Sequence, residues 1–288
     1  MSGDNEGQRS DWTDAGRGWV AQEAVFDAAF APVTEAILTA ARLTTGDRVL
    51  DVGCGSGTLL AAATAAGAEA VGVDISPTMV EAARRRVPAA TVALADVQES
   101  DLLDVAPGRP FDRVVSRFGV MFFADPVAAF SRVRAAVADD ATLVFACWRT
   151  REENPVFTRG TDVLTRRLPA AEPEADDAPG PTTFADPARL RAVLSAAGWA
   201  PTVAPFDFVC DYAAADPTGR SDGVEERLAV VLATSTGARA RAVLEPGLGP
   251  DGWAALVEEV RADLRSHLDD DGALRMPGAV WLVTATPA

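Results

Sequence analysis

The stretch 49–57, VLDVGCGSG, carries the residues whose types and spacing best suit ligand chemistry. An apolar run leads into Gly53, Gly55 and Gly57, and Asp51 stands two places before the first of these glycines. Glycines at the end of a strand allow a tight turn and a close approach of the backbone, with the N-terminus of the next helix facing the ligand. The stretch therefore predicts a site for a nucleotide-like molecule.

Two more carboxylates follow at the ends of predicted strands. Asp74 ends VGVD, and an acid about twenty residues past such glycines is placed to accept the ribose hydroxyls of an adenosine. Asp96 ends the next predicted strand, ALAD, where it can face the exocyclic amine of adenine. Three successive strands would thus end in acids on one edge of a sheet.

The glycine spacing favours one kind of nucleotide-like ligand over another. A dinucleotide places its pyrophosphate on a G-x-G-x-x-G turn, whereas this turn reads G-x-G-x-G and has Asp51 beside it. A ligand with no phosphate and a positive end suits it better, and S-adenosylmethionine (SAM) has an ammonium and a sulfonium. An NAD-binding oxidoreductase is the alternative that this spacing disfavours.

The segments VLDVGCGSG, VGVDIS, ALADV and FDRVVSRFGVMFF closely resemble the ordered motifs of class I SAM-dependent methyltransferases. The subgroup that they resemble includes ubiquinone/menaquinone-type C-methyltransferases and many small-molecule enzymes. The resemblance covers about residues 20–150 and extends to the final segment WLVTATP. Together with the reasoning above, it implies a cofactor site formed by Asp51, Gly53, Gly55, Gly57, Asp74, Ile75, Met79, Asp96, Val97 and Ser116. Ile75 and Met79 would pack near the adenosine, the Val97 amide would face adenine, and the Ser116 backbone would lie near the methionyl end.

The resemblance also implies where a methyl acceptor would bind, namely over the strand that ends in SRFGVMFF. Candidates for that pocket are Arg117, Phe118, Met121 and Phe122, with Trp19 and Trp148 as further walls. Arg117 would hold an acidic group of the acceptor or the SAM carboxylate, with a surface ion pair as the alternative. The apolar candidates have ordinary core packing as their alternative.

No catalytic residue is assigned by the sequence, because displacement at an activated methyl mainly needs orientation and exclusion of water. A general base is required only if the nucleophile must lose a proton. Tyr212 and His267, each the sole residue of its type, are the weak candidates. No metal site is expected.

These residues need a scaffold, and strand and helix signals alternate from Arg48 to Trp148. Two helices precede that region, between residues 19 and 43, with a break at Pro32. Such alternation predicts an α/β fold, a doubly wound (Rossmann-like), mostly parallel sheet. Helical signals between 213 and 275 predict a cap inserted before the last strand.

The predicted organisation has four parts. Residues 1–45 form an N-terminal arm and lid helices, and 46–150 form the SAM-binding core. Residues 151–275 form a substrate-binding cap region that contains a late core strand near 202–210. Residues 276–288 form the final core strand.

Composition excludes several classes of function. The net charge of −16 disfavours nucleic acid and anionic lipid as partners. All basic residues are arginine, which removes Schiff-base and P-loop lysine chemistry. No apolar run is long enough for a membrane span and no signal peptide is visible, so we expect a cytoplasmic protein of a bacterium. The oligomeric state stays open, with a homodimer as one option.

We therefore expect a SAM-dependent methyltransferase that acts on a C, O or N nucleophile of a small molecule. A quinone-like compound or a secondary metabolite is the expected acceptor, and S-adenosylhomocysteine (SAH) the expected product. The alternative on the same fold is an enzyme that binds SAM but catalyses cyclisation or decarboxylation without methyl transfer.

Overall fold

The computed structural model describes residues 16–170 and 178–288. Residues 1–15 of the predicted arm, and 171–177 of the loop after the core, lie outside the described part. Residues 16–21 are helical. The chain then continues into α2 (Glu23–Ala29) and α3 (Ala31–Ala41), which join at Phe30. Pro32 lies in the first turn of α3, where its missing N–H costs nothing.

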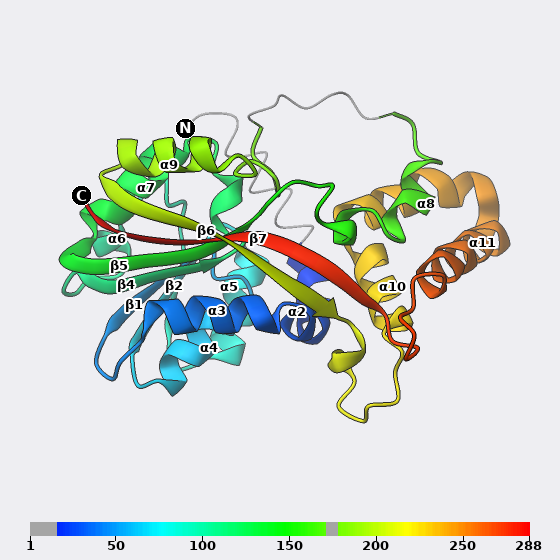
Figure 1. Cartoon of the computed structure of the whole chain (residues 1–288), viewed down its shortest axis with the longest axis horizontal. Coiled ribbons are helices and arrows are strands. Elements are labelled where there is room, and N and C mark those ends of the chain that lie inside the picture. Colours follow the sequence, from blue (N-terminus) through cyan, green and yellow to red (C-terminus); the bar gives the residue numbers. More distant parts are fainter. Residues whose placement is uncertain (1–15, 171–177) are drawn as a thin grey trace.

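One seven-stranded sheet organises the described chain, with strand order β3-β2-β1-β4-β5-β7-β6 (Figure 1). All neighbouring pairs are parallel except those that β7 makes with β5 and β6. The strands are β1 (Arg48–Val52), β2 (Glu69–Asp74), β3 (Thr91–Leu94), β4 (Phe111–Arg117), β5 (Val137–Trp148), β6 (Trp199–Asp211) and β7 (Arg275–Pro287). The predicted doubly wound, mostly parallel sheet is confirmed.

Helices cover both faces of this sheet, because β1 at its centre is buried at every residue and needs apolar partners on each side. In Figure 1, α3 and α4 lie on one face, and α7 and α9 lie on the other. The core helices are α4 (Thr58–Ala65), α5 (Pro77–Arg86), α6 (Leu102–Val105), α7 (Pro126–Ala135) and α9 (Pro187–Ala196). Most begin at a residue that caps them, as Ser76 does for α5 and Asp125 for α7.

A helical cap, made of α8 (Thr161–Thr165), α10 (Val224–Ala233) and α11 (Ser235–Arg265), lies beyond one end of the sheet (Figure 1). The connectivity explains this placement. Asp211 at the end of β6 pairs with Arg275 at the start of β7, so the intervening helices leave and re-enter the sheet at one edge. Because β7 is antiparallel to β5, that edge is where the parallel strands have their carboxyl ends. The cap thus lies at the edge where such sheets bind ligands.

The cap departs from the sequence expectation in detail. Before β6, the 3-10 turn Pro155–Phe157 is followed by the short α8. The helical region expected from residue 213 starts with the 3-10 turn Ala213–Ala215, and its first α-helix begins only at Val224. The last helical segment of the cap is the single element α11, which is kinked at Gly249, where φ is 68°. Glycine tolerates that left-handed backbone and so permits the kink between Pro246 and Pro250.

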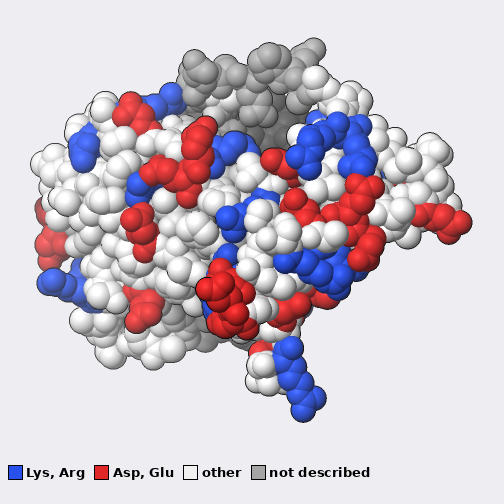
Figure 2. Space-filling view, turned by 45° about the vertical axis from the view of Figure 1, so that its right-hand side comes forward, with Lys and Arg blue, Asp and Glu red and all other residues white. Residues whose placement is uncertain are grey.

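Charged side chains of both signs are interspersed on the face that brings the cap forward (Figure 2). Ion pairs within the cap include Arg261–Glu225 at 2.6 Å and Arg167–Glu259 at 2.5 Å. No single helix of the described residues is long and apolar enough to cross a membrane. The bent pair α2 and α3, at 67° to each other, meets that test only when the two are taken together.

Candidate active site

The glycine turn follows β1 at the point where the sheet order reverses between β1 and β4. Gly53, Gly55 and Gly57 have φ values of 65°, 54° and 92°, a region that favours glycine. A Cβ on Gly53 would lie 2.8 Å from the Cα of Gly119, so β1 and the segment after β4 approach too closely for any side chain. A Cβ on Gly55 would meet nothing within 4 Å, which leaves open space above that residue.

Asp74, at the end of β2, holds the turn in place. Its carboxylate accepts hydrogen bonds from the Gly55 amide at 2.9 Å and the Ser76 amide at 2.8 Å. Burial raises the pKa of Asp74, and these hydrogen bonds counteract part of that rise. The same carboxylate therefore shapes the turn and remains in the wall of the cavity described below.

Asp51 is the most unusual polar group of the site. The residue is 2% exposed, and neither carboxylate oxygen has a hydrogen-bond partner within the described chain. Burial raises its pKa to about 8, against the opposing effect of Arg117 and with a further contribution from Asp74. A buried carboxylate without partners is costly in the free protein, so a cation beside it would be strongly favoured. The ammonium and sulfonium of SAM fit this requirement.

Asp96 lies just beyond β3 and not at its end, because β3 ends at Leu94; the sequence expectation was wrong by two residues. Its Oδ1 accepts hydrogen bonds from the Gln98 backbone amide at 2.9 Å and from Gln98 Nε2 at 3.1 Å. Asp96, Val97 and Gln98 all contribute to the wall of the cavity. The residues after β3 thus reach the site as a turn.

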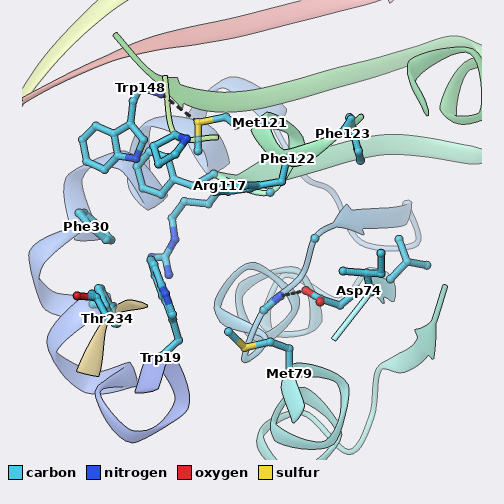
Figure 3. Close-up of a pocket in the computed structure, with 18 of the residues that line it drawn as sticks. Trp19, Phe30, Asp74, Met79, Arg117, Met121, Phe122, Phe123, Trp148 and Thr234 are labelled. Carbon is cyan, nitrogen blue, oxygen red and sulfur yellow. Dashed lines mark hydrogen bonds between the residues drawn. The ribbon is translucent and has the colours of Figure 1, made fainter. Parts of the chain in front are cut away.

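A cavity of about 250 Å³ joins these polar residues to an aromatic region. In Figure 3, Asp74 and Met79 lie on one side, Phe30, Trp148 and Trp19 on the other, and Arg117 extends between them. Most of the residues predicted from the sequence line this cavity: Trp19, Gly53, Gly55, Asp74, Ile75, Met79, Asp96, Val97, Arg117, Phe118, Met121, Phe122 and Trp148. Asp51 lines a smaller adjoining cavity of about 70 Å³, which shares Gly53, Gly55 and Arg117 with the first.

The aromatic side of the cavity is a packed cluster. Phe118 and Trp148 stack with ring centroids 4.4 Å apart, and Phe30 meets both rings edge-on at 5.1 and 5.6 Å. Phe157 of the cap region contacts Trp148 from another side at 5.3 Å. Phe118 has a φ of 65°, a left-handed conformation that is strained for a bulky residue and is typically retained at functional sites.

Arg117 is buried, and its guanidinium has an anionic partner and two hydroxyl partners. Its side chain is 13% exposed and forms an ion pair with Asp27 of α2 at 3.2 Å. It also donates hydrogen bonds to Thr34 at 2.7 Å and Thr58 at 3.2 Å. Burial lowers its pKa, and the charge of Asp27 offsets part of that effect. The alternative of an ion pair is found, but inside the site and not at the surface, where Arg117 joins the N-terminal helices to the core.

Four predicted residues lie outside both cavity walls. Gly57 precedes α4, and the buried Ser116 donates from Oγ to the Val52 carbonyl at 2.6 Å. Tyr212 is buried, and burial raises its phenol pKa, which opposes use as a base. His267 follows the end of α11. The structure brings neither Tyr212 nor His267 to the cavity.

Several wall residues were not predicted from the sequence: Phe26, Phe30, Gln98, Phe123, Val156, Phe157, Pro181, Arg227, Val230 and Thr234. Phe26 and Phe30 are four residues apart on the N-terminal helices, so helical spacing with aromatic type was the available signal. Gln98 and Phe123 follow the core strands β3 and β4, and the remaining residues come from the cap region and its connections, where no motif marks them. Their position depends on how the cap docks.

Comparison with known proteins agrees with this geometry. Residues 49–140 match a family model described as a methyltransferase domain. The chain is 31% identical over 136 residues to the aklanonic acid methyltransferase DauC of a Streptomyces species, covering 46% of this chain and 59% of that protein. It is 29% identical over 155 residues to the ubiquinone biosynthesis O-methyltransferase of Xanthomonas campestris, covering 53% of this chain and 62% of that protein. The chain thus spans about three fifths of the length of these relatives.

Solved structures show the same fold at low sequence identity. The YcgJ protein of Bacillus subtilis superposes with a TM-score of 0.50 at 16% identity, covering 88% of this chain and 97% of that one. The [4+2]-cyclase SpnF superposes with a TM-score of 0.50 at 15% identity, covering 89% of this chain and 81% of that one. The match identifies residues 49–140 as a methyltransferase domain, and the two relatives support a SAM-dependent methyltransferase family of class I. The cofactor of this family is SAM, and the unpartnered Asp51 and the open space above Gly55 fit it.

Proposed function

We propose that this protein transfers the methyl group of SAM to a small-molecule acceptor held in the aromatic part of the cavity. The observation that carries the proposal is the continuity of that cavity. One continuous space has the glycine turn, Asp74 and Asp96 in one wall and stacked aromatic rings in the other. A cofactor and an acceptor would therefore meet inside the protein, away from water.

The cofactor side has a residue for each part of SAM. Asp74 would accept the ribose hydroxyls, and Asp96 with the Val97 amide would face adenine. Ile75 and Met79 would pack on the adenosine. These roles are supported by the common position of the four side chains and the Val97 backbone around the cavity.

The methionyl end would lie over the glycine turn. Gly53, Gly55 and Gly57 would give the backbone close access to it, and the Ser116 backbone would lie nearby. The carboxylate of Asp51 would hold the positive end, which is supported by its burial and by its two unpartnered oxygens. When bound, SAM supplies a methyl group already activated by the sulfonium.

The acceptor side would act by positioning and by exclusion of water. Phe118, Trp148, Met121, Phe122 and Trp19 would form an apolar slot for a flat molecule. Such a slot orients a nucleophile and removes solvent, and both effects accelerate displacement at an activated methyl. Arg117 would act as a positioning residue for this slot, because its ion pair with α2 fixes the wall that α2 supplies.

The acceptor class that we propose is a quinone-like compound or a secondary metabolite of a bacterium, methylated at C, O or N. The names of two relatives, which refer to aklanonic acid and to ubiquinone biosynthesis, support this class. Residues 1–45 would serve as arm and lid, 46–150 as the cofactor-binding core, and 151–275 as the acceptor-binding region. Residues 276–288 would complete the sheet.

The test is calorimetric titration with SAM, SAH and NAD in parallel. Micromolar binding of SAM and SAH, with no response to NAD, is expected. Asp74→Ala should weaken SAH binding, while Asp139→Ala, a change at a fully exposed acid on β5, should not. Release of SAH is then measured with a panel of quinones and phenols. Binding of NAD alone would refute the proposal, and SAM binding without SAH release from any acceptor would favour chemistry other than methyl transfer.

A further inference from the structure

Among the described residues, Arg227 is the one charged side chain that the cap contributes to the cavity wall. It lies on α10 and is 3% exposed. Its Nη2 donates hydrogen bonds to the carbonyl of Val156 at 2.6 Å and the carbonyl of Arg159 at 3.2 Å. Its guanidinium carbon lies 5.4 Å from the centre of the Tyr212 ring. These contacts fix the guanidinium in place without neutralising it.

Within the described residues, no carboxylate forms an ion pair with Arg227, and its Nε has no hydrogen-bond partner. Both hydrogen bonds to carbonyl oxygens come from Nη2, and the Tyr212 side chain also interacts with the guanidinium. The other buried arginine of the cavity, Arg117, differs in this respect, because Asp27 pairs with it. The remaining charged wall residues, Asp74 and Asp96, accept hydrogen bonds from neighbouring groups.

Acids close to Arg227 in sequence are used elsewhere. Glu225 pairs with Arg261 at 2.6 Å, and Glu226 accepts a hydrogen bond from Ser221 at 2.6 Å. A chain with a net charge of −16 has carboxylates in abundance, yet none is brought to this position in the described residues. Burial of a cation without an anion is costly, and an anion bound in the cavity would remove that cost.

The position of Arg227 relative to the aromatic cluster defines which part of a ligand it would meet. Val156, whose carbonyl binds Arg227, precedes Phe157, and Phe157 contacts Trp148. Trp148 in turn stacks on Phe118. The guanidinium therefore lies at the cap end of the aromatic slot, and Thr234, just after α10, lines the same cavity (Figure 3).

We infer that Arg227 binds a carboxylate of the acceptor, so that the enzyme selects aromatic acids over neutral aromatic compounds. This inference rests on the proposed function, because it concerns the acceptor side of that site. A planar guanidinium forms strong, charge-assisted hydrogen bonds with a carboxylate, and a low-dielectric cavity strengthens them. The aromatic body of the acceptor then lies against Trp148 and Phe118, with its acid group anchored in the cap.

The experiment uses the SAH-loaded protein and a matched pair of probes, 2-naphthoate and 2-naphthamide, which differ in charge but hardly in shape. Calorimetry should show naphthoate binding at least about 10-fold tighter than naphthamide, a difference of about 1.4 kcal/mol. Arg227→Met should abolish the preference and leave the affinity for naphthamide unchanged. Arg166→Met removes the same charge from an exposed position on the cap and should retain the preference.

Arg227→Lys guards against a failure of the Met variant to fold, since it keeps a buried cation. It should reduce the preference for naphthoate without changing the affinity for SAH, because a lysine ammonium cannot reproduce the planar guanidinium. Equal binding of the two probes to the wild type would overturn the inference, as would failure of naphthoate to bind. The inference would also be overturned if Arg227→Met still bound naphthoate more tightly than naphthamide, or if Arg227→Lys showed the full wild-type preference. Failure of the proposed function would be visible separately, as absence of SAH binding at the loading step.

Discussion

The buried carboxylate of Asp51 predicts that cofactor binding is coupled to loss of a proton. Its pKa of about 8 has burial as its main cause, so the carboxyl is largely protonated in the free protein at pH 7. An ammonium or sulfonium beside it stabilises the ionised form. The raised pKa therefore means that the free protein holds a proton which the complex releases. Binding should strengthen as the pH rises toward 8.

The size of the affinity loss follows from the difference between the assay pH and the pKa of Asp51. Each pH unit below about 8 requires about 1.4 kcal/mol to ionise Asp51, which is a 10-fold loss of affinity. Between pH 8 and pH 6 the association constant for SAH should therefore fall by about 50- to 100-fold. At pH 6 to 7, close to one proton should be released for each SAH bound.

The assay is calorimetry at pH 6, 7 and 8 in two buffers with different enthalpies of protonation, which yields both the affinity and the number of protons released. Asp51→Asn keeps the shape but cannot ionise, so its affinity should be low at pH 8 and nearly independent of pH. Asp139→Asn, at an exposed position, should behave as the wild type. A wild-type affinity that does not change with pH, or a slope that survives in Asp51→Asn, would refute the assignment of Asp51 to the positive end of the cofactor.

Three further changes test the parts that surround this carboxylate. Asp74→Ala should weaken SAH binding by about 1–3 kcal/mol in calorimetry, because ribose hydroxyls would lose their acceptor; unchanged affinity in a folded variant would remove Asp74 from the site. Gly53→Ala should lower the free energy of unfolding in urea by about 2–4 kcal/mol, since its Cβ would lie 2.8 Å from Gly119. Gly46→Ala has a similarly positive φ but open space, so it should cost only about 1–2 kcal/mol, and equal losses would show that the close approach is unimportant. Asp27→Asn should cost about 1–3 kcal/mol in thermal or urea unfolding at pH 7, because a buried guanidinium loses its partner. Although burial acts to raise the pKa of Asp27, its hydrogen bonds and neighbouring arginines lower it, so the difference from wild type should shrink as the pH falls below about 4.

The core of the fold followed from the sequence because its signals are local. Helix α5, within the region where strand and helix signals alternate, begins at a local signal, since Ser76 caps its start and Pro77 fits the first turn. The apolar runs at 48–52 and 111–117 became neighbouring buried strands. Glycine and aspartate positions at strand ends indicated the cofactor edge in advance, because parallel strands bring their carboxyl ends together whatever the rest of the chain does.

The acceptor side was decided by tertiary structure. Arg117 could not be assigned a partner from sequence, because Asp27 is ninety residues away and reaches it only after α2 docks. Likewise nothing local distinguishes Arg227 from the other arginines of the cap. Arg227 becomes a buried cation only when α10 packs against the chain at Val156. Its guanidinium then has carbonyl partners but no acid among the described residues. Local sequence determines which residues end a strand or begin a helix. Only the packing of distant elements determines which charges are left without a partner inside a cavity, because burial and pairing depend on the whole chain.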